Sequence, residues 1–460
     1  MQFKYLNKII VNSSKTVKNV LNTFNSTAQY TDGAFIIVVN DQGACVGVVT
    51  DGDIRRILTN KDILNLKIHN IMNKDFTFVN KNDDHHTVLR KFDLRVKNLP
   101  VLNDKGLPLD LYVYSKFVAS SRSKTRIIRA RAPVRVSYSG GGTDMSNYIN
   151  KYSSFVLSST INKYCTSSII MRDDSEIHIN SKDLDLKYSA KNIHEIKYGD
   201  KLDLIKAAIK IMQPDYGFDI ETYAEFDPGT GLGGSSAVVV SVLGALNYFR
   251  NDKQLDIYQI ADLAYQVERI EMDIYGGWQD QYATTFGGFS WIEFRKDEVL
   301  VNPLKLQRNT LLELEYNLML FKLGSSRSSS RIQEKLIKKI NKNILDAIFK
   351  DMNEISIKMK EAILKGKVKQ FADLLHESWI LKQKMNQSVS NKKIEDCYNI
   401  CRKIGALGGK LLGAGQSGYL LIYSSPLYQK KIIRALEKKG VYQEPFKFSN
   451  IGLEVWSTER

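Results

Sequence analysis

The segment PGTGLGGSSA, Pro228–Ala237, is a glycine-rich loop that runs directly into an apolar segment. Its four glycines allow backbone N–H groups to converge on an anion, and residues 235–246 are expected to form a helix whose N-terminus faces that anion. The lysine of the P-loop pattern G-x-x-x-x-G-K-[ST] is missing. The loop therefore predicts a phosphate cradle made of backbone groups and a helix end, and the alternative is a tight helix-opening turn without a ligand.

Two further glycine motifs flank this loop in the sequence. RAPVRVSYSGGGTDMSNY, Arg131–Tyr148, contains an alternating strand, three glycines and then Asp144. GGKLLGAGQSGYLLIY, Gly408–Tyr423, is a second glycine turn between two apolar strands. Each pattern alone is common, because glycine turns occur wherever backbone approaches a ligand or another chain segment.

A fourth motif carries carboxylates. AYQVERIEMDIYGGWQDQYATTFGGF, Ala264–Phe289, begins as a helix and continues through two glycines to an aspartate. Glu268 and Asp280 stand twelve positions apart. Phosphoryl transfer needs a metal to neutralise charge and a group to orient and deprotonate the nucleophile, and carboxylates serve both purposes. Glu271 and Asp273 lie on the same acidic stretch and compete for the metal role.

In this order and spacing the motifs resemble the signatures of the GHMP kinases, a family that includes galactokinase, homoserine kinase, mevalonate kinase and phosphomevalonate kinase. The resemblance covers about residues 129–460. It implies an α+β chain with the two-domain GHMP kinase fold, in which an N-terminal α/β part precedes a ferredoxin-like C-terminal part. It also implies ATP and Mg²⁺ as cofactors.

The resemblance assigns roles to individual residues. Asp280 takes the proton of the attacking hydroxyl, Arg135 balances charge and steadies the transferring group, and Ser236 and Glu268 hold Mg²⁺. One departure is Gly234, where many relatives carry a serine. The residues expected around the nucleotide are Pro228, Gly229, Gly231, Leu232, Gly233, Gly234, Ser235, Ser236 and Ala237.

The substrate is indicated by GGGTD, GWQDQYA and LGSSRSSS, which look most like D-glycero-D-manno-heptose 7-phosphate kinases. These enzymes phosphorylate the anomeric hydroxyl to give the 1,7-bisphosphate on the way to GDP-heptose for surface polysaccharides. Arg327, within LGSSRSSS, is expected to clamp the 7-phosphate, and the alternative is a polar surface loop. The remaining residues expected to bind the sugar are Gly141, Gly142, Thr143, Asp144, Gly413 and Gly415.

Two other functions stay open from the sequence. A sugar-1-kinase of the fucose or galactose type would use the same machinery on an unphosphorylated sugar. Galactokinase carries Glu and His where this chain has Gly141 and Gly142, so its galactose contacts are missing here. A nucleotide-binding regulator without turnover is the second alternative, although Ser236, Glu268 and Asp280 are all present.

The first 120 residues contain a degenerate duplication. FIIVVNDQGACVGVVTDGDIRRIL, Phe35–Leu58, reads as strand, turn, strand and helix, and NLPVLNDKGLPLDLYVYSKF, Asn98–Phe117, repeats the strands and the turn. This resembles a tandem pair of CBS domains, a module that binds adenine nucleotides and regulates attached enzymes.

The first copy carries the family's ligand positions. By the resemblance, Thr50 and Asp53 hold the phosphate and ribose of a regulatory nucleotide. The alternative is that Asp53 only caps its helix. Aligning the two turns places Val113 and Lys116 at the equivalent positions, so the second copy is expected to have lost the ligand.

Domains are expected at 1–122 for the CBS-like module, 123–128 for a linker, 129–320 for the N-terminal kinase domain and 321–460 for the C-terminal kinase domain. Four scattered cysteines are typical of a reducing cytoplasm, with Cys397 and Cys401 expected to pack rather than bind metal. The net charge of +16 favours anionic small substrates over nucleic acid, because the lysines are spread along helix faces. No membrane partner is expected, and CBS pairs often dimerise, so a homodimer is expected.

Overall fold

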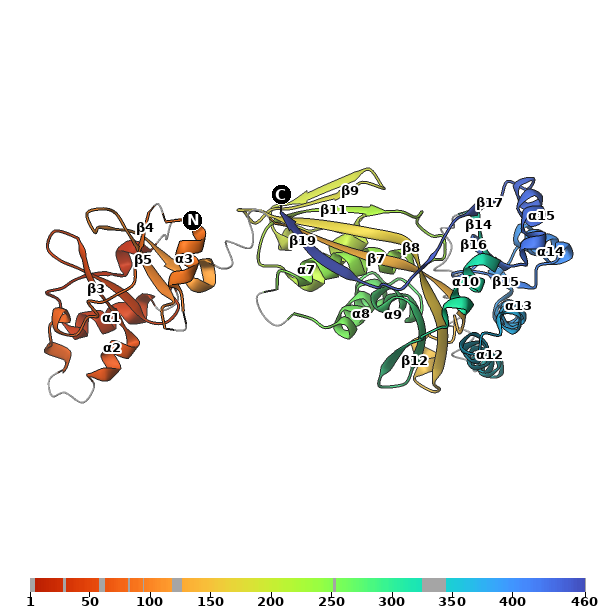
Figure 1. The fold of residues 1–460 in the computed structure, drawn as a ribbon, viewed down its shortest axis with the longest axis horizontal. Coiled ribbons are helices and arrows are strands. Elements are labelled where there is room, and N and C mark those ends of the chain that lie inside the picture. Colours follow the sequence, from red (N-terminus) through yellow and green to blue (C-terminus); the bar gives the residue numbers. More distant parts are fainter. Residues whose placement is uncertain are drawn as a thin grey trace. The chain divides into compact units, whose positions relative to one another are not determined.

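The computed structural model describes residues 5–27, 30–57, 63–81, 83–93, 95–117, 126–250, 254–324 and 345–459. The chain forms two compact units, Met1–Thr125 and Arg126–Arg460 (Figure 1).

The N-terminal unit consists of two copies of one arrangement. In each copy a short strand pairs in parallel with the next strand, which then forms an antiparallel hairpin with the third. A helix follows the first strand in both copies. The first copy comprises β1 (Ile10–Asn12), α1 (Val17–Thr27), β2 (Phe35–Val39), β3 (Cys45–Thr50) and α2 (Asp51–Arg56), and the second comprises β4 (Val79–Asn80), α3 (His85–Lys91), β5 (Asn98–Leu102) and β6 (Pro108–Val113).

The strand registers of the two hairpins coincide. Thr50 pairs with Phe35 in the first copy, and Val113 pairs with Asn98 in the second. Both hairpins also carry a register irregularity one residue before the turn. This is the equivalence that the sequence alignment of the two turns predicts, with Val113 at the position of Thr50.

The larger unit is built around β8 (Ser154–Met171), the longest strand of a nine-stranded sheet. It pairs antiparallel with β7 (Arg126–Ser139), β11 (Phe218–Ala224) and β12 (Phe289–Phe294). The other strands of this sheet are β9 (Ile177–Ser181), β10 (Leu186–Ala190), β13 (Val299–Pro303), β18 (Phe448–Ser449) and β19 (Glu454–Glu459).

Helix α7 (Gly234–Asn247) lies against β7 and β8. Its sequence, GSSAVVVSVLGALN, is apolar on nearly all sides, which is typical of a helix buried within a core rather than lying on a surface. The other helices of this part are α5 (Ser146–Ile149), α6 (Asp203–Met212), α8 (Ile257–Gln266), α9 (Gln279–Phe286) and α10 (Arg308–Asn317).

A second, four-stranded antiparallel sheet has the order β15-β16-β14-β17. Its strands are β14 (Leu318–Gly324), β15 (Gly408–Leu411), β16 (Gly418–Tyr423) and β17 (Tyr442–Glu444). Its helices are α12 (Asp346–Leu364), α13 (Val368–Met385), α14 (Lys392–Ile404) and α15 (Pro426–Glu437). One continuous core joins α13 and the large sheet, so the two sheets of this unit share their apolar interior.

Two expected boundaries differ from the structure. Residues 126–128, expected in the linker, begin β7 because they pair with β8 and β19. The division expected at 320/321 falls inside β14, and β18 and β19 return from the C-terminal segment to pair with β8 and β7. The last strands of the chain therefore complete the first sheet of the kinase unit.

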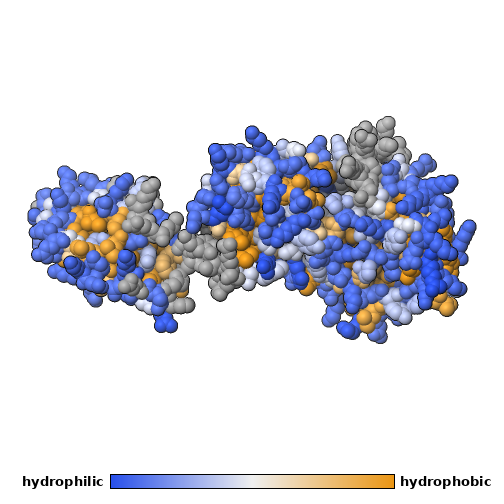
Figure 2. Space-filling model, turned by 90° about the horizontal axis from the view of Figure 1, so that it is seen from above, coloured by the Kyte–Doolittle hydropathy of each residue, from blue (hydrophilic) through white to orange (hydrophobic). Residues whose placement is uncertain are grey.

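Hydrophilic side chains cover most of the face seen in Figure 2, with scattered apolar patches on both units. Among the described residues, no helix combines the length and the apolar character needed to cross a bilayer.

Candidate active site

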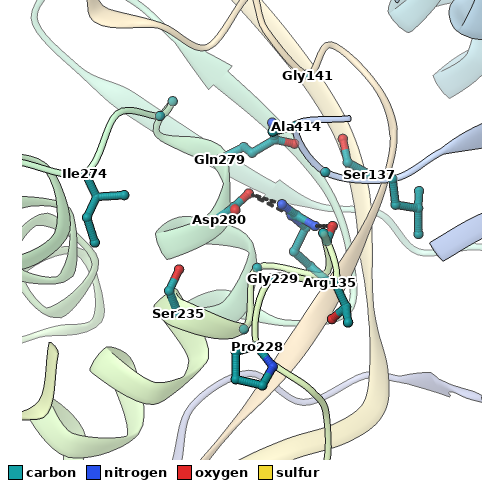
Figure 3. Close-up of a pocket in the computed structure, with 18 of the residues that line it drawn as sticks. Arg135, Ser137, Gly141, Pro228, Gly229, Ser235, Ile274, Gln279, Asp280 and Ala414 are labelled. Atoms are coloured by element: carbon teal, nitrogen blue, oxygen red, sulfur yellow. Dashed lines mark hydrogen bonds and ion pairs between the residues drawn. The ribbon is translucent and has the colours of Figure 1, made fainter. Parts of the chain in front are cut away.

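One cavity of about 460 Å³ brings together all three glycine motifs. Its described walls come from the glycine-rich loop before α7, from β7 and the turn after it, from the first turn of α9, and from the turn between β15 and β16. The close-up in Figure 3 shows residues of these segments facing a common space. Motifs that are far apart in the sequence therefore share one site.

The glycine-rich loop lies with its backbone directly against the turn after β15. Gly231 has a φ of 81°, and a Cβ atom there would lie 2.7 Å from the carbonyl oxygen of Leu412. A Cβ atom on Gly413 would lie 2.3 Å from the Cα atom of Gly231. Neither position has room for a side chain, so close backbone contact fixes the loop against the third motif.

The missing serine at position 234 has a steric explanation. A Cβ atom on Gly234 would lie 2.4 Å from the ring of Phe226, which also lines the cavity. The ring of Phe226 therefore occupies the space that a serine side chain at position 234 would need.

The two serines in the first turn of α7 point in different directions. Ser235 is exposed and lines the cavity (Figure 3). Ser236 is fully buried, and its Oγ donates to Oε2 of Glu268 at 2.5 Å. Leu232 and Ala237 are also buried and lie behind the cavity wall. The predicted nucleotide-binding residues that line the cavity are Pro228, Gly229, Gly231, Gly233, Gly234 and Ser235.

Glu268 lies in a turn of π-helix, Val267–Glu271, that follows α8. Its side chain is completely buried, and Oε2 accepts from Ser236 and Gln281. Oε1 has no hydrogen-bond partner among the described residues, and the nearest cation, Nη1 of Arg269, is 3.9 Å away. A buried carboxylate oxygen without a donor fits a cation, although Glu268 itself is not part of the described cavity wall.

The competing carboxylates Glu271 and Asp273 are exposed and do not line the cavity. Glu271 instead accepts from the hydroxyl of Tyr198 at 2.5 Å. The described residues contain no cluster of three or more His, Cys, Asp or Glu side chains that could hold a metal.

Asp280 lies in the first turn of α9 and forms an ion pair with Arg135 of β7 (Figure 3). Nε and Nη2 of the arginine donate to Oδ1 at 2.7 and 2.5 Å, and Nη1 donates to the carbonyl oxygen of Gly231 at 2.7 Å. Arg135 is only 3 % exposed. The arginine thus joins the predicted base to the glycine-rich loop, and both of its bonds to Asp280 use the same oxygen, Oδ1.

Asp144 is the second carboxylate of the cavity wall, and it is 1 % exposed. Burial raises its pKa, while N–H groups of Gln279 and Gly142 donate to it at 3.0 and 2.8 Å and oppose that rise. Gly141 and Gly142 also line the cavity. Thr143 does not: its hydroxyl is buried and bonds to Gly140 and Ser154, so the expected sugar contact is replaced by a structural one.

Sequence reasoning missed several polar groups of the wall. Oγ of Ser137 and Oε1 of Gln279 are buried, line the cavity and have no hydrogen-bond partner among the described residues. A Cβ atom on Gly141 would lie 3.2 Å from the amide nitrogen of Gln279 and 3.6 Å from Oγ of Ser137. The absence of a side chain at Gly141 therefore keeps both groups open to a ligand.

Two lysines of the cavity wall were also missed, Lys382 of α13 and Lys410 of β15. Lys410 lies inside the third glycine motif, but its burial follows only from the strand direction. Lys382 belongs to no motif. Nothing in a single sequence separates such lysines from solvated ones on a helix face.

The other predicted sugar contacts divide between the cavity and an undescribed segment. Gly413 and Gly415 line the cavity next to Ala414. Arg327, the predicted phosphate clamp, lies outside the described residues.

In the N-terminal unit, Thr50 and Asp53 bond to each other at the start of α2. Oδ2 of Asp53 accepts from the backbone nitrogen and the hydroxyl of Thr50 at 2.8 and 2.7 Å, and Oδ1 pairs with Arg56. Asp53 therefore caps the N-terminus of α2 in the structure, which is the role that the sequence leaves as an alternative to nucleotide binding. In the second copy, Lys116 donates to the carbonyl oxygen of Tyr30 at 3.0 Å.

The four cysteines are free thiols. Cys397 and Cys401 lie in the apolar core beneath the small sheet, and burial raises the pKa of Cys401 to about 12. They pack, as the sequence predicts.

Three families match segments of the chain. Residues 203–288 match "GHMP kinases N terminal domain", residues 359–442 match "GHMP kinases C terminal", and residues 6–60 match "CBS domain". The last segment contains the whole first copy of the N-terminal duplication.

Similar proteins cover most of the larger unit. D-glycero-alpha-D-manno-heptose 7-phosphate kinase of Campylobacter jejuni is 34% identical over 338 residues, which is 72% of this chain and 99% of that protein. A solved D-glycero-D-manno-heptose 1-phosphate kinase from "Bacteriodes thetaiotaomicron" has a TM-score of 0.60 and 30% identity, covering 72% of this chain and 98% of its own. The bifunctional fucokinase/GDP-fucose pyrophosphorylase of Arabidopsis thaliana is 26% identical over 67% of this chain and 31% of that protein.

Proposed function

The chain belongs to the GHMP kinase family, and we propose that it transfers the γ-phosphoryl group of ATP to the anomeric hydroxyl of D-glycero-D-manno-heptose 7-phosphate. The product is the 1,7-bisphosphate, a precursor for GDP-heptose and surface polysaccharide. The observation that carries the proposal is the Arg135–Asp280 ion pair, which joins a candidate base to the glycine-rich loop within one cavity. The 34% identity to a heptose 7-phosphate kinase supports this substrate over others.

The reaction follows from the positions of the cavity residues. The glycine-rich loop and the N-terminus of α7 receive the phosphates of ATP, since their N–H groups are the ones that bind anions in such loops. Asp280 accepts the anomeric proton while the sugar oxygen attacks the γ-phosphorus in line, and the bond from this phosphorus to the bridging oxygen of ADP breaks. The guanidinium of Arg135 contacts both Asp280 and the glycine-rich loop, and it stabilises the charge of the transferring group.

Mg²⁺, when bound, would neutralise charge on the phosphates. Glu268 and Ser236 would hold it, as the family resemblance implies, and the unpartnered Oε1 of Glu268 is the observation that supports a cation there. Ser235 presents a further hydroxyl to the cavity. A Glu268→Gln variant is expected to need at least tenfold more Mg²⁺ for half-maximal rate, and an unchanged Mg²⁺ requirement would remove Glu268 from the site.

An assay of ATP consumption with a panel of acceptors tests the substrate. Heptose 7-phosphate, the same heptose without phosphate, fucose and galactose are compared at equal concentration, and the product is identified by phosphorus NMR. Preference for heptose 7-phosphate with a new anomeric phosphate supports the proposal. Preference for fucose or galactose establishes the alternative sugar-1-kinase, and no turnover with any sugar leaves the nucleotide-binding regulator.

For the N-terminal unit we propose binding of an adenine nucleotide in the first copy, because the segment that matches the CBS domain contains Thr50 and Asp53. The sign of the regulation and the expected homodimer are not needed for this test. Calorimetry on the full chain with AMP is expected to show binding that Asp53→Ala abolishes. Lys116→Ala, at the equivalent position of the second copy, is the matched control and keeps AMP binding. If Asp53→Ala binds AMP normally, the residue only caps its helix.

A further inference from the structure

Two lysine side chains of the C-terminal part of the kinase unit line the cavity, the buried Lys410 and the partly buried Lys382. Nζ of Lys410 donates to the carbonyl oxygen of Tyr138 at 2.9 Å, and Nζ of Lys382 donates to those of Leu411 and Gly413 at 3.1 and 2.5 Å. An ammonium group has three N–H donors, so two remain on Lys410 and one on Lys382. Neither lysine has a carboxylate within ion-pair distance among the described residues.

The cavity wall carries more cationic side chains than carboxylates, although one of the cations, Arg269, lies 3.9 Å from the buried carboxylate of Glu268. The described cavity wall carries five cationic side chains and three carboxylates. Of the carboxylates near the lysines, Asp280 is already paired with Arg135, and Asp144 already accepts from the N–H groups of Gln279 and Gly142, although burial raises its pKa. The cationic residues are Arg135, Lys201, Arg269, Lys382 and Lys410, and the carboxylates are Asp144, Asp183 and Asp280.

This excess of positive charge affects the lysines themselves. Burial and the charge of Arg135 lower the pKa of Lys382 to about 7. Burial and the charges of Lys382 and Arg135 lower the pKa of Lys410 well below its ordinary value. Because a buried cation is costly unless an anion accompanies it, a ligand that supplies negative charge would stabilise the protonated forms of both lysines.

The phosphates of the nucleotide already have a binding loop elsewhere in the cavity. Figure 3 shows the glycine-rich loop with Ser235 on one side of the Arg135–Asp280 ion pair, and Ser137 and Gln279 on the other. Lys410 donates to the carbonyl oxygen of Tyr138, the residue that follows Ser137 on β7, and it lines the same cavity. Under the proposed function, the acceptor binds on the side of Ser137 and Gln279, away from the glycine-rich loop.

We propose that Lys382 and Lys410 form an anion subsite that binds the phosphate group already present on the sugar substrate. The inference rests on the proposed function, in which the acceptor is a sugar phosphate, and it names the residues that select for that phosphate. The three free N–H donors of the two ammonium groups match the oxygens of a phosphate monoester. The subsite lies among the described residues and does not require Arg327.

Kinetics on four proteins test this assignment. Lys382→Met and Lys410→Met are compared with wild type and with Lys384→Met, an exposed lysine of the same helix that does not line the cavity. Each subsite variant is expected to raise KM for heptose 7-phosphate by about 30-fold, the loss of one charge-assisted hydrogen bond. With the unphosphorylated heptose, and for KM of ATP, the change is expected to stay below about threefold. Lys384→Met is expected to behave as wild type.

The subsite is overturned if both acceptors lose rate equally or if KM for ATP rises instead, because the lysines then serve the transferring phosphoryl group. Lys382 is only partly buried, so its variant keeps the test open if Lys410→Met does not fold.

A second measurement separates this inference from the heptose assignment. Binding of inorganic phosphate is measured by calorimetry on the full chain, with a non-hydrolysable ATP analogue saturating the nucleotide site. Binding to wild type that is lost in Lys382→Met establishes the subsite even if heptose 7-phosphate is not turned over. No binding to wild type overturns it, whatever the sugar.

Discussion

The two proposed ends of the kinase cavity present different parts of the chain to a ligand. The proposed nucleotide end, Pro228–Ser235, offers backbone groups and two glycines, Gly231 and Gly234, with no room for a Cβ atom. The proposed acceptor end offers side chains: among the described residues, Oγ of Ser137 and Oε1 of Gln279 have no hydrogen-bond partner, and Lys382 and Lys410 have no carboxylate within ion-pair distance. A binding site made of backbone groups requires glycines without side chains, so almost any substitution at those positions disturbs it. An end built from side chains can change its ligand by single replacements, so substrate specificity is expected to reside there.

The largest expected effect falls on the residue between the two ends. Asp280→Asn preserves shape and removes the proton acceptor, so kcat is expected to fall by about 10³-fold. Affinities for ATP and heptose 7-phosphate, measured by calorimetry, are expected to stay within about threefold because Asn keeps the hydrogen-bonding shape. A near-normal kcat would remove Asp280 as the base, and a joint loss of both affinities would show that the two ends are not independent.

The next effect tests whether the nucleotide end depends on backbone alone. In Gly231→Ala, the φ of 81° and the contact with Leu412 are expected to cost about 2 kcal/mol, or about 30-fold in ATP affinity. KM for the sugar is expected to change little. Gly440→Ala is the matched control, since its φ of 69° is equally positive but a Cβ atom there meets nothing within 4 Å. Equal effects of the two variants on ATP affinity would refute the cradle.

A pH dependence is expected only at the acceptor end. The pKa of Lys382 is about 7 in the free protein, and the groups that face it are Arg135, Asp144, Asp280 and Lys410. The phosphate ligand binds the protonated amine, so its affinity is expected to fall as pH rises from 7 to 9, by up to about tenfold per unit. Affinity for unphosphorylated heptose is expected to stay level over the same range. Calorimetry at several pH values checks this, and a flat profile for the phosphorylated sugar would contradict it.

The smallest expected effect compares two hydroxyls on one strand. Ser137 and Ser139 both have buried Oγ atoms without a hydrogen-bond partner among the described residues, but only Ser137 lines the cavity. Ser137→Ala is expected to raise KM for the sugar by about fivefold, the loss of one neutral hydrogen bond. Ser139→Ala is expected to leave steady-state kinetics unchanged. If both variants behave alike, the unpartnered hydroxyl of Ser137 does not contact the sugar.

The motifs and the resemblance they carry were sufficient to predict the fold class, and six of the nine residues expected around the nucleotide line one cavity. Their binding of a nucleotide stays a prediction. The motifs were also sufficient to predict the Arg135–Asp280 partnership, which joins residues 145 positions apart. Clustered glycines, and an arginine and an aspartate at fixed positions within these motifs, have few roles other than a binding site.

The direction of neighbouring side chains was not predictable. Ser235 and Ser236 are adjacent, but one faces the cavity and the other faces Glu268, because successive residues of a helix point about 100° apart. Which serine faces the ligand depends on where α7 begins. Thr143 is a similar case, since its neighbours Gly142 and Asp144 reach the cavity and it does not.

The positions of Lys382 and Lys410 in the cavity and the pairing of β19 with β7 could not be predicted for another reason. Lys382 has the local sequence of any lysine on an amphipathic helix, and only the packing of α13 near the third motif brings it into the cavity. The pairing of β19 with β7 joins residues such as Arg131 and Glu454, 323 positions apart, and no turn signal connects them. Contacts at such separation are decided by the whole core.

The pairing of β19 with β7 also bears on how the protein is made. Arg131 is synthesised long before Glu454. The edge of β7 that pairs with β19 therefore stays without its partner strand during almost the whole synthesis of the kinase unit. The N-terminal unit, with both of its hairpins within residues 35–113, can fold while the rest is still being translated. Nascent chains that stop before residue 454 leave one side of β7 unpaired over residues 126–131 and ready to join another chain.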